Sequence, residues 1–72
     1  MNLVGPRVRQ LREQKGLTQE QLTARCHLQQ WPISRGSLAK IEARVRRVTD
    51  LEVAALARAL DVEVQTLFIE AD

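Results

Sequence analysis

Apolar residues recur along the chain at intervals of three and four, the spacing that gives a helix one apolar face. No segment shows a strong alternation of apolar and polar residues, which is the pattern of a half-buried strand. The pattern therefore predicts an all-α fold, a compact bundle of five short helices that forms a single domain over residues 1–72. The expected helices span residues 5–15, 18–30, 34–44, 49–60 and 63–69.

Three of these helices are expected to begin at a residue that caps the free backbone N–H groups. Thr18 is followed three residues later by Gln21, and Thr49 by Glu52, so each pair forms the capping-box pattern. Ser34 is a suitable cap for the third helix, without the full box. Local sequence therefore predicts where the second, third and fourth helices begin.

The residues that repeat on one face of each predicted helix form the candidate core. We expect these apolar side chains to be buried: Val4, Val8, Leu11, Leu22, Cys26, Leu28, Leu38, Ile41, Val45, Val53, Leu56, Ala57, Leu60, Val64, Leu67 and Phe68. Pro32 must end the second helix, because the residue before a proline is disfavoured in the helical conformation. We expect Trp31, just before it, to fold back and pack against the domain.

The charged residues divide the chain into a basic and an acidic portion. Residues 1–49 hold ten Lys or Arg and three acidic residues, a balance of +7. Residues 50–72 hold one Arg and six acidic residues, a balance of −5. Such a basic portion indicates a polyanionic partner, the alternative being the ordinary charged surface of a helical protein. Nine of the eleven cations are arginine, whose guanidinium suits bidentate contacts to phosphate or guanine.

Residue types that support catalysis or metal binding are scarce. Cys26 and His27 are the only cysteine and histidine, and neighbouring residues on a helix do not face each other. Zinc needs about four ligands from Cys, His or acidic residues. No glycine-rich phosphate loop occurs. We therefore expect no catalytic residues, no metal and no cofactor, and a protein that is not an enzyme.

The same composition bears on where the protein resides. A single cysteine excludes an internal disulfide, which is typical of proteins of the reducing cytoplasm. No apolar run approaches the roughly 20 residues of a membrane span. The N-terminus lacks the charged and apolar regions of a secretory signal. We expect a cytoplasmic protein that does not contact membranes.

Two segments carry a resemblance to a known family. They are Leu17-Thr18-Gln19-Glu20-Gln21-Leu22-Thr23 and Ile33-Ser34-Arg35-Gly36-Ser37-Leu38-Ala39-Lys40-Ile41-Glu42. Together with Arg12, residues 48–52 and residues 60–68, they resemble the phage-repressor and Cro-like, or XRE-type, helix-turn-helix family. The resemblance covers about residues 4–69, nearly the whole chain.

In that family the second and third helices form the helix-turn-helix, and the third lies in the major groove of DNA. The DNA-binding positions that the resemblance implies are Gln19, Ser34, Arg35, Gly36, Ser37, Lys40, Arg44, Arg46 and Arg47. Arg35, Ser37 and Lys40 are expected to face base edges. Gln19 and the arginines that follow the third helix are expected to lie close to phosphates.

A further pair of positions is implied to be structural. Arg12 matches an arginine of the family that pairs with the glutamate found here as Glu42, so we expect an ion pair between the first and third helices.

The chain departs from the family pattern in three respects. The connection between Cys26 and Ile33 is about five residues longer than the usual tight turn. Gly36 replaces a side chain that often contacts bases. Arg44 and Asp61 stand where the family favours glycine after the third and fourth helices, and Asp tolerates the left-handed conformation better than Arg does.

The resemblance implies a sequence-specific regulator of transcription, a repressor-type protein of a prokaryote or phage, that binds double-stranded DNA. It is expected to bind a pseudo-palindromic operator as a homodimer, joined through the fifth helix, where Leu67, Phe68 and Ile69 cluster, and the exposed part of the fourth. The alternative is a protein-interaction module of the same fold, such as an antitoxin that holds a toxin partner through its acidic C-terminal third.

Overall fold

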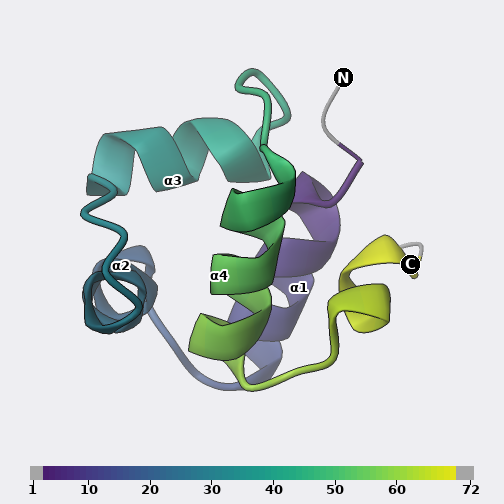
Figure 1. Cartoon of the computed structure of the whole chain (residues 1–72), viewed down its shortest axis with the longest axis horizontal. Coiled ribbons are helices and arrows are strands. Elements are labelled where there is room, and N and C mark those ends of the chain that lie inside the picture. The colour runs from purple at the N-terminus through teal and green to yellow at the C-terminus, as the bar shows by residue number, and fades with distance from the viewer. Residues whose placement is uncertain (1–2, 70–72) are drawn as a thin grey trace.

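The computed structural model describes residues 3–69, which form four α-helices and a short 3-10 helix (Figure 1). The α-helices are α1 (Gly5–Gln14), α2 (Gln19–Leu28), α3 (Arg35–Glu42) and α4 (Asp50–Leu60), and the 3-10 helix is η1 (Val64–Phe68). No strand occurs within residues 3–69, and the predicted all-α fold is confirmed.

Helix α4 lies at the centre of the bundle, with α2 packed on one side and η1 on the other (Figure 1). Helix α3 crosses one end of the bundle and contacts α1 and α2. The α4 side chains Leu56 and Leu60 are completely buried, as are Val8 of α1, Leu22 of α2 and Leu38 of α3. One core therefore holds all the elements together, and it anchors the inner side of α3 while the outer side stays at the surface. None of the helices in residues 3–69 is long and apolar enough to cross a membrane.

The helix starts follow the capping signals in the sequence. The Thr18 side chain accepts a hydrogen bond from the Gln21 N–H, and the Gln21 side chain accepts one from the Thr18 N–H. Thr49 and Glu52 form the same reciprocal box at α4. The Ser34 hydroxyl accepts from the backbone N–H at the third position of α3. All three predicted caps are confirmed.

All four α-helices end in the same way. A residue with positive φ follows each helix, and the next N–H donates to the carbonyl five residues earlier at 2.9–3.1 Å, which is the Schellman motif. The positive-φ residues are Gly16 (70°), Gln30 (61°), Arg44 (66°) and Asp61 (57°). Only the first is glycine, so three of these ends place a side chain in a conformation that costs roughly 1–2 kcal/mol.

Two predictions of burial are wrong because of these helix ends. Leu28 is 82% exposed, since α2 ends there and the chain turns away at Gln30, before Pro32 is reached. Val45 is 72% exposed, since the left-handed Arg44 directs the chain out of α3 and places Val45 beyond the helix. Trp31 is partly buried and packs against the core, as expected.

The fifth element also differs from its prediction. It is a 3-10 helix, not an α-helix, and such a short, tightly wound segment directs few side chains inward. Leu67 alone is fully buried there, whereas Val64 and Phe68, both expected in the core, are 43% and 55% exposed. The Arg7 Nε donates to the Thr66 carbonyl at 3.1 Å and attaches η1 to α1.

Candidate nucleic-acid interface

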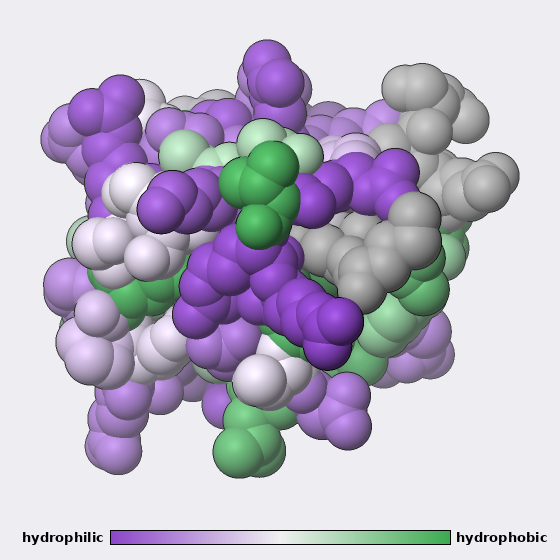
Figure 2. Space-filling model, turned by 90° about the horizontal axis from the view of Figure 1, so that it is seen from above, coloured by the Kyte–Doolittle hydropathy of each residue, from purple (hydrophilic) through white to green (hydrophobic). Residues whose placement is uncertain are grey.

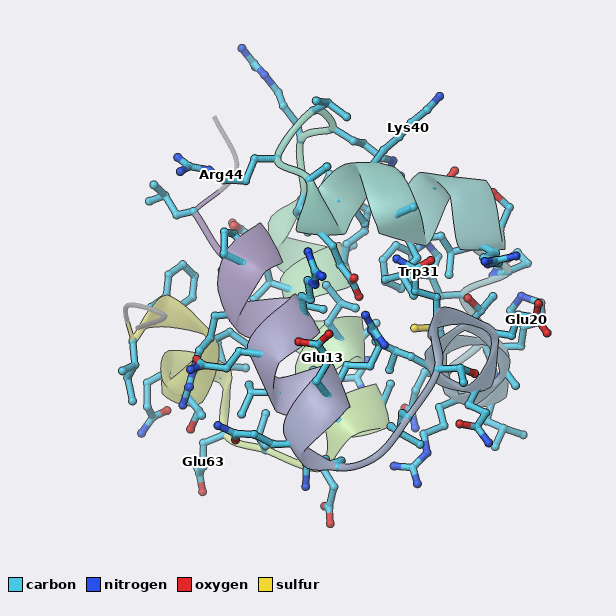
Figure 3. All side chains as sticks on the ribbon, turned by 180° about the vertical axis from the view of Figure 1, so that it is seen from behind. Glu13, Glu20, Trp31, Lys40, Arg44 and Glu63 are labelled. Atoms are coloured by element: carbon cyan, nitrogen blue, oxygen red, sulfur yellow. The ribbon has the colours of Figure 1, made fainter. Side chains whose placement is uncertain are left out.

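The outer side of α3 is polar, whereas its inner side is apolar. Leu38 and Ile41 are completely buried, and Arg35, Gly36 and Lys40 are exposed. Figure 2 looks onto α3 and the loop that follows it, and shows a mostly hydrophilic face with isolated apolar side chains. Figure 3 shows Lys40 extending away from the body of the molecule. The helix can therefore present its polar side to a large ligand without disturbing the core.

The start of α3 is held by hydrogen bonds among its own serines. The Ser34 Oγ accepts from the Ser37 N–H and donates to the Ser37 Oγ, both at 3.1 Å. A Cβ added at Gly36 would meet only the Ser34 Oγ, at 4.0 Å, so packing does not require a glycine there. The missing side chain leaves Arg35 as the one long side chain in the first turn of α3.

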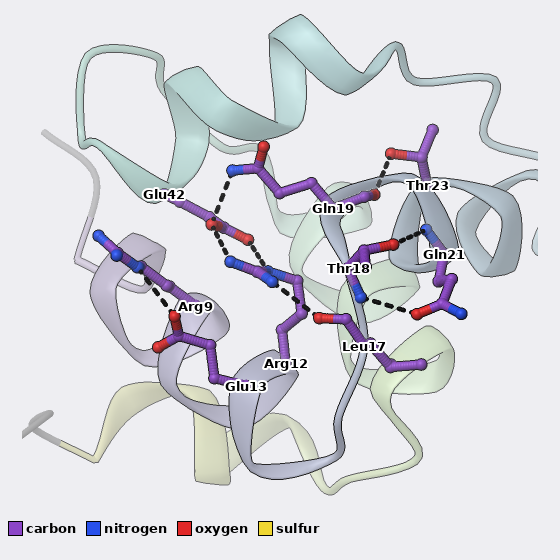
Figure 4. A network of polar contacts seen from close by, with 9 residues as sticks. All are labelled: Arg9, Arg12, Glu13, Leu17, Thr18, Gln19, Gln21, Thr23 and Glu42. Carbon is purple, nitrogen blue, oxygen red and sulfur yellow. Dashed lines mark hydrogen bonds and ion pairs between the residues drawn. The ribbon is translucent and has the colours of Figure 1, made fainter.

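A buried ion pair joins α1 to α3 (Figure 4). The Arg12 Nε donates to the Glu42 Oε2 at 2.8 Å, and the Arg12 Nη2 donates to the Glu42 Oε1 at 3.1 Å. The two side chains are only 10% and 3% exposed. The hydrogen bonds to Glu42 raise the pKa of Arg12 above its ordinary value. The third nitrogen, Nη1, donates to the Leu17 carbonyl at 2.8 Å, so the same guanidinium also holds the turn before α2.

Gln19, an expected phosphate contact, is attached to this ion pair. Its side-chain Nε2 donates to the Glu42 Oε1 at 3.1 Å, and its backbone carbonyl accepts from the Thr23 hydroxyl at 2.7 Å (Figure 4). The first residue of α2 is therefore fixed relative to α3 by a buried carboxylate. The pairing of Glu42 with Gln19 had no signal in the sequence, because the two residues lie 23 positions apart.

The three arginines after α3 have different surroundings. The Arg46 Nη1 and Nη2 donate to the two carboxylate oxygens of Glu52 at 3.1 and 3.0 Å. Glu52 is also the capping-box residue of α4, and the hydrogen bond from Arg46 lowers its pKa. Arg44 and Arg47 are exposed. Arg46 thus holds the loop to the start of α4, whereas Arg44 and Arg47 lie at the surface.

The cysteine and the histidine, which are the remaining reactive side chains, lie in different surroundings. Cys26 is completely buried, and burial raises the pKa of its thiol to about 11, so the reactive thiolate is suppressed. The His27 Nε2 lies 2.9 Å from the Ile33 carbonyl, on the connection to α3. Within residues 3–69, no three His, Cys, Asp or Glu side chains gather as metal ligands would.

A family model assigns this architecture. The model of a helix-turn-helix family matches residues 8–67, from α1 to η1. The chain belongs to the XRE-type helix-turn-helix family. No curated protein and no solved structure matches it. Members of this family bind DNA, so the protein is a DNA-binding helix-turn-helix regulator, of a family that is generally non-enzymatic.

Replacing Arg44 by glycine should raise the free energy of unfolding by about 1 kcal/mol, because glycine adopts φ 66° without strain. The same change should weaken DNA binding, since it removes a positive charge from the loop after α3. Gln30→Gly is the matched control: it relieves the same strain at φ 61° without changing the charge. Urea denaturation and DNA titration of both variants measure the two effects. An Arg44→Gly variant less stable than the wild type would contradict this account.

Proposed function

We propose that this protein is a sequence-specific regulator of transcription that binds a pseudo-palindromic DNA site as a homodimer, with α3 in the major groove. The observation that carries the proposal is the start of α3, which is capped by Ser34, exposed, and supplied with hydrogen-bond donors. A recognition helix contacts base edges through its N-terminal residues. Its buried side, anchored by Leu38 and Ile41, gives the rigid support that such contacts require.

The residues of this surface divide into two roles. Arg35, Ser37 and Lys40 contact base edges, and the guanidinium of Arg35 is suited to the O6 and N7 of guanine. Gln19 and the loop arginines Arg44, Arg46 and Arg47 contact phosphates. Ser34 and Gly36 lie where the start of α3 comes close to the DNA backbone. The +7 balance of residues 1–49 supports such a phosphate surface.

The homodimer is inferred from the apolar surface at η1. Phe68 and Ile69 are 55% and 56% exposed, whereas Leu67 beside them closes the core. A small module contacts few base pairs, and a two-fold dimer doubles the site. We place the dimer contact at η1 and the exposed part of α4. We further propose that the protein is a repressor-type regulator of the prokaryotic cytoplasm that excludes or recruits polymerase.

Selection of bound duplexes from a random-sequence pool tests this function. We expect enriched sequences with two inverted half-sites whose centres lie about one helical turn apart, roughly 10 base pairs. Sedimentation of the protein with an enriched duplex should give two protein chains on each duplex. A single unrepeated motif, with a monomer both in solution and on DNA, would contradict the dimer. A pool that shows no enrichment would contradict sequence-specific binding.

A further inference from the structure

The first turns of α2 and α3 carry opposite charges that face each other. Glu20 is the second residue of α2, and Arg35 is the first residue of α3. The Arg35 Nη1 lies 3.5 Å from the Glu20 Oε1, and the two side chains are 65% and 74% exposed. Together with Arg12, Thr18 and Gln19 they line an open hollow of about 420 Å³. Figure 3 shows Glu20 at the edge of the molecule, on the side where α3 begins.

The helix dipoles act differently on the two charges. A carboxylate is favoured at a helix N-terminus, whereas a cation is disfavoured there. Glu20 is therefore well placed on α2, but Arg35 is repelled by the free N–H groups of its own helix. The Glu20 carboxylate offsets this repulsion and attracts the guanidinium towards α2. Since an exposed ion pair adds little to folding stability, its main consequence is the direction of the Arg35 side chain.

The contact that approaches Glu20 is made by Nη1 of the guanidinium. With Nη1 towards the carboxylate and the side chain 65% exposed, the Nε–Nη2 edge of Arg35 can turn towards a ligand. That edge carries two parallel N–H donors, which is what a bidentate contact to the O6 and N7 of one guanine requires. An arginine held on one side by a carboxylate has fewer orientations to lose when it binds a base.

We propose that Glu20 is a positioning residue for Arg35 and thereby determines sequence specificity. The inference rests on the proposed function of α3 as the recognition helix. Glu20 has two separate effects on binding. Its negative charge opposes the phosphates of every duplex, whatever the sequence, whereas its hold on Arg35 favours the duplex that offers a guanine at the right position. Specificity is the difference between the affinities for two duplexes, so the uniform repulsion cancels and only the hold on Arg35 increases it.

The test uses Glu20→Gln, which removes the charge and preserves the shape. The probes are a duplex enriched by the wild-type protein from a random-sequence pool, a copy with the guanine opposite Arg35 replaced, and a scrambled duplex. That guanine is the base pair at which the Arg35→Ala variant no longer discriminates between bases. We expect Glu20→Gln to bind the scrambled duplex more tightly, with the difference fading at high salt. Its ratio of affinities for the enriched and the single-substituted duplex should fall by about fivefold or more.

Two comparisons separate positioning from a general charge effect. Glu13→Gln removes an exposed carboxylate of α1, which is paired with Arg9, and should leave the affinity ratio unchanged. In an Arg35→Ala background, Glu20→Gln should change the ratio no further. Thermal unfolding of Glu20→Gln should lie within a few degrees of the wild type, because only a favourable first-turn charge is lost.

The outcomes distinguish this inference from the function on which it rests. An unchanged or higher ratio in Glu20→Gln, with a wild type that discriminates between the duplexes, overturns the inference alone. A wild type that binds all three duplexes equally overturns the proposed function and the inference with it.

Discussion

The Glu42→Ala variant should lose about 3–5 kcal/mol of its free energy of unfolding, because the substitution leaves the Arg12 charge buried without its carboxylate. The Arg12 side chain is only 10% exposed. Its guanidinium donates hydrogen bonds to both carboxylate oxygens of Glu42 and to the Leu17 carbonyl. Small domains are stable by only about 5–15 kcal/mol, so the loss is a large part of the total. Urea denaturation followed by circular dichroism measures it.

Replacing both partners by apolar residues distinguishes the cost of a stranded charge from the loss of the ion pair itself. The double variant Arg12→Met, Glu42→Leu should be more stable than Glu42→Ala, because no unpaired charge remains in the interior. The exposed pair of Arg9 and Glu13 is the matched control, and Glu13→Ala should change stability by no more than about 0.5 kcal/mol. Equal costs for Glu42→Ala and Glu13→Ala would show that the buried pair behaves as an ordinary surface pair.

The second large effect is expected at Arg35. Arg35→Ala should lower the affinity for the cognate duplex by about 1–3 kcal/mol and relax the preference at one base position. Arg47→Ala should weaken binding to all duplexes alike and flatten the slope of log affinity against log salt by about one unit. Titration of each variant with a cognate and a scrambled duplex, over a range of salt concentrations, distinguishes base contacts from phosphate contacts.

Arg47 is a cleaner control for this experiment than Arg46. Loss of the Arg46 side chain also removes the partner of Glu52 at the start of α4, so its effect on binding includes a change in the loop. If Arg35→Ala lowers the affinities for cognate and scrambled duplexes equally, Arg35 contacts phosphate. The base contacts must then come from Ser37 and Lys40.

Features that depend on neighbouring residues could be predicted from the sequence. The caps at Thr18, Ser34 and Thr49 act over three residues, and the helices begin directly after them. The helix ends were harder, because Gln30 is not a residue type that signals a left-handed conformation. Only the tertiary structure, which requires the chain to turn there, makes a glutamine adopt it. Because the turns at Gln30 and Arg44 were not expected, Leu28 and Val45 were placed in the predicted core, although both are exposed.

Contacts between distant segments were the least predictable part of the candidate interface. The sequence marked Glu52 as a capping residue and Arg46 as a phosphate contact, but the bond between them depends on the path of the intervening loop. Glu20 received no role from the sequence, because its distance from Arg35 is set by the packing of α2 on α3. The sequence shows which residues are charged, whereas the tertiary structure determines which of them form ion pairs.

Methylation of guanine N7 is the most direct test of DNA recognition through α3. This atom lies in the major groove, and a recognition helix placed there shields it. The bound wild-type protein should protect guanines in two clusters about 10 base pairs apart. Arg35→Ala should restore methylation of one guanine in each cluster. A bound protein that leaves every guanine N7 reactive would contradict the placement of α3 in the major groove.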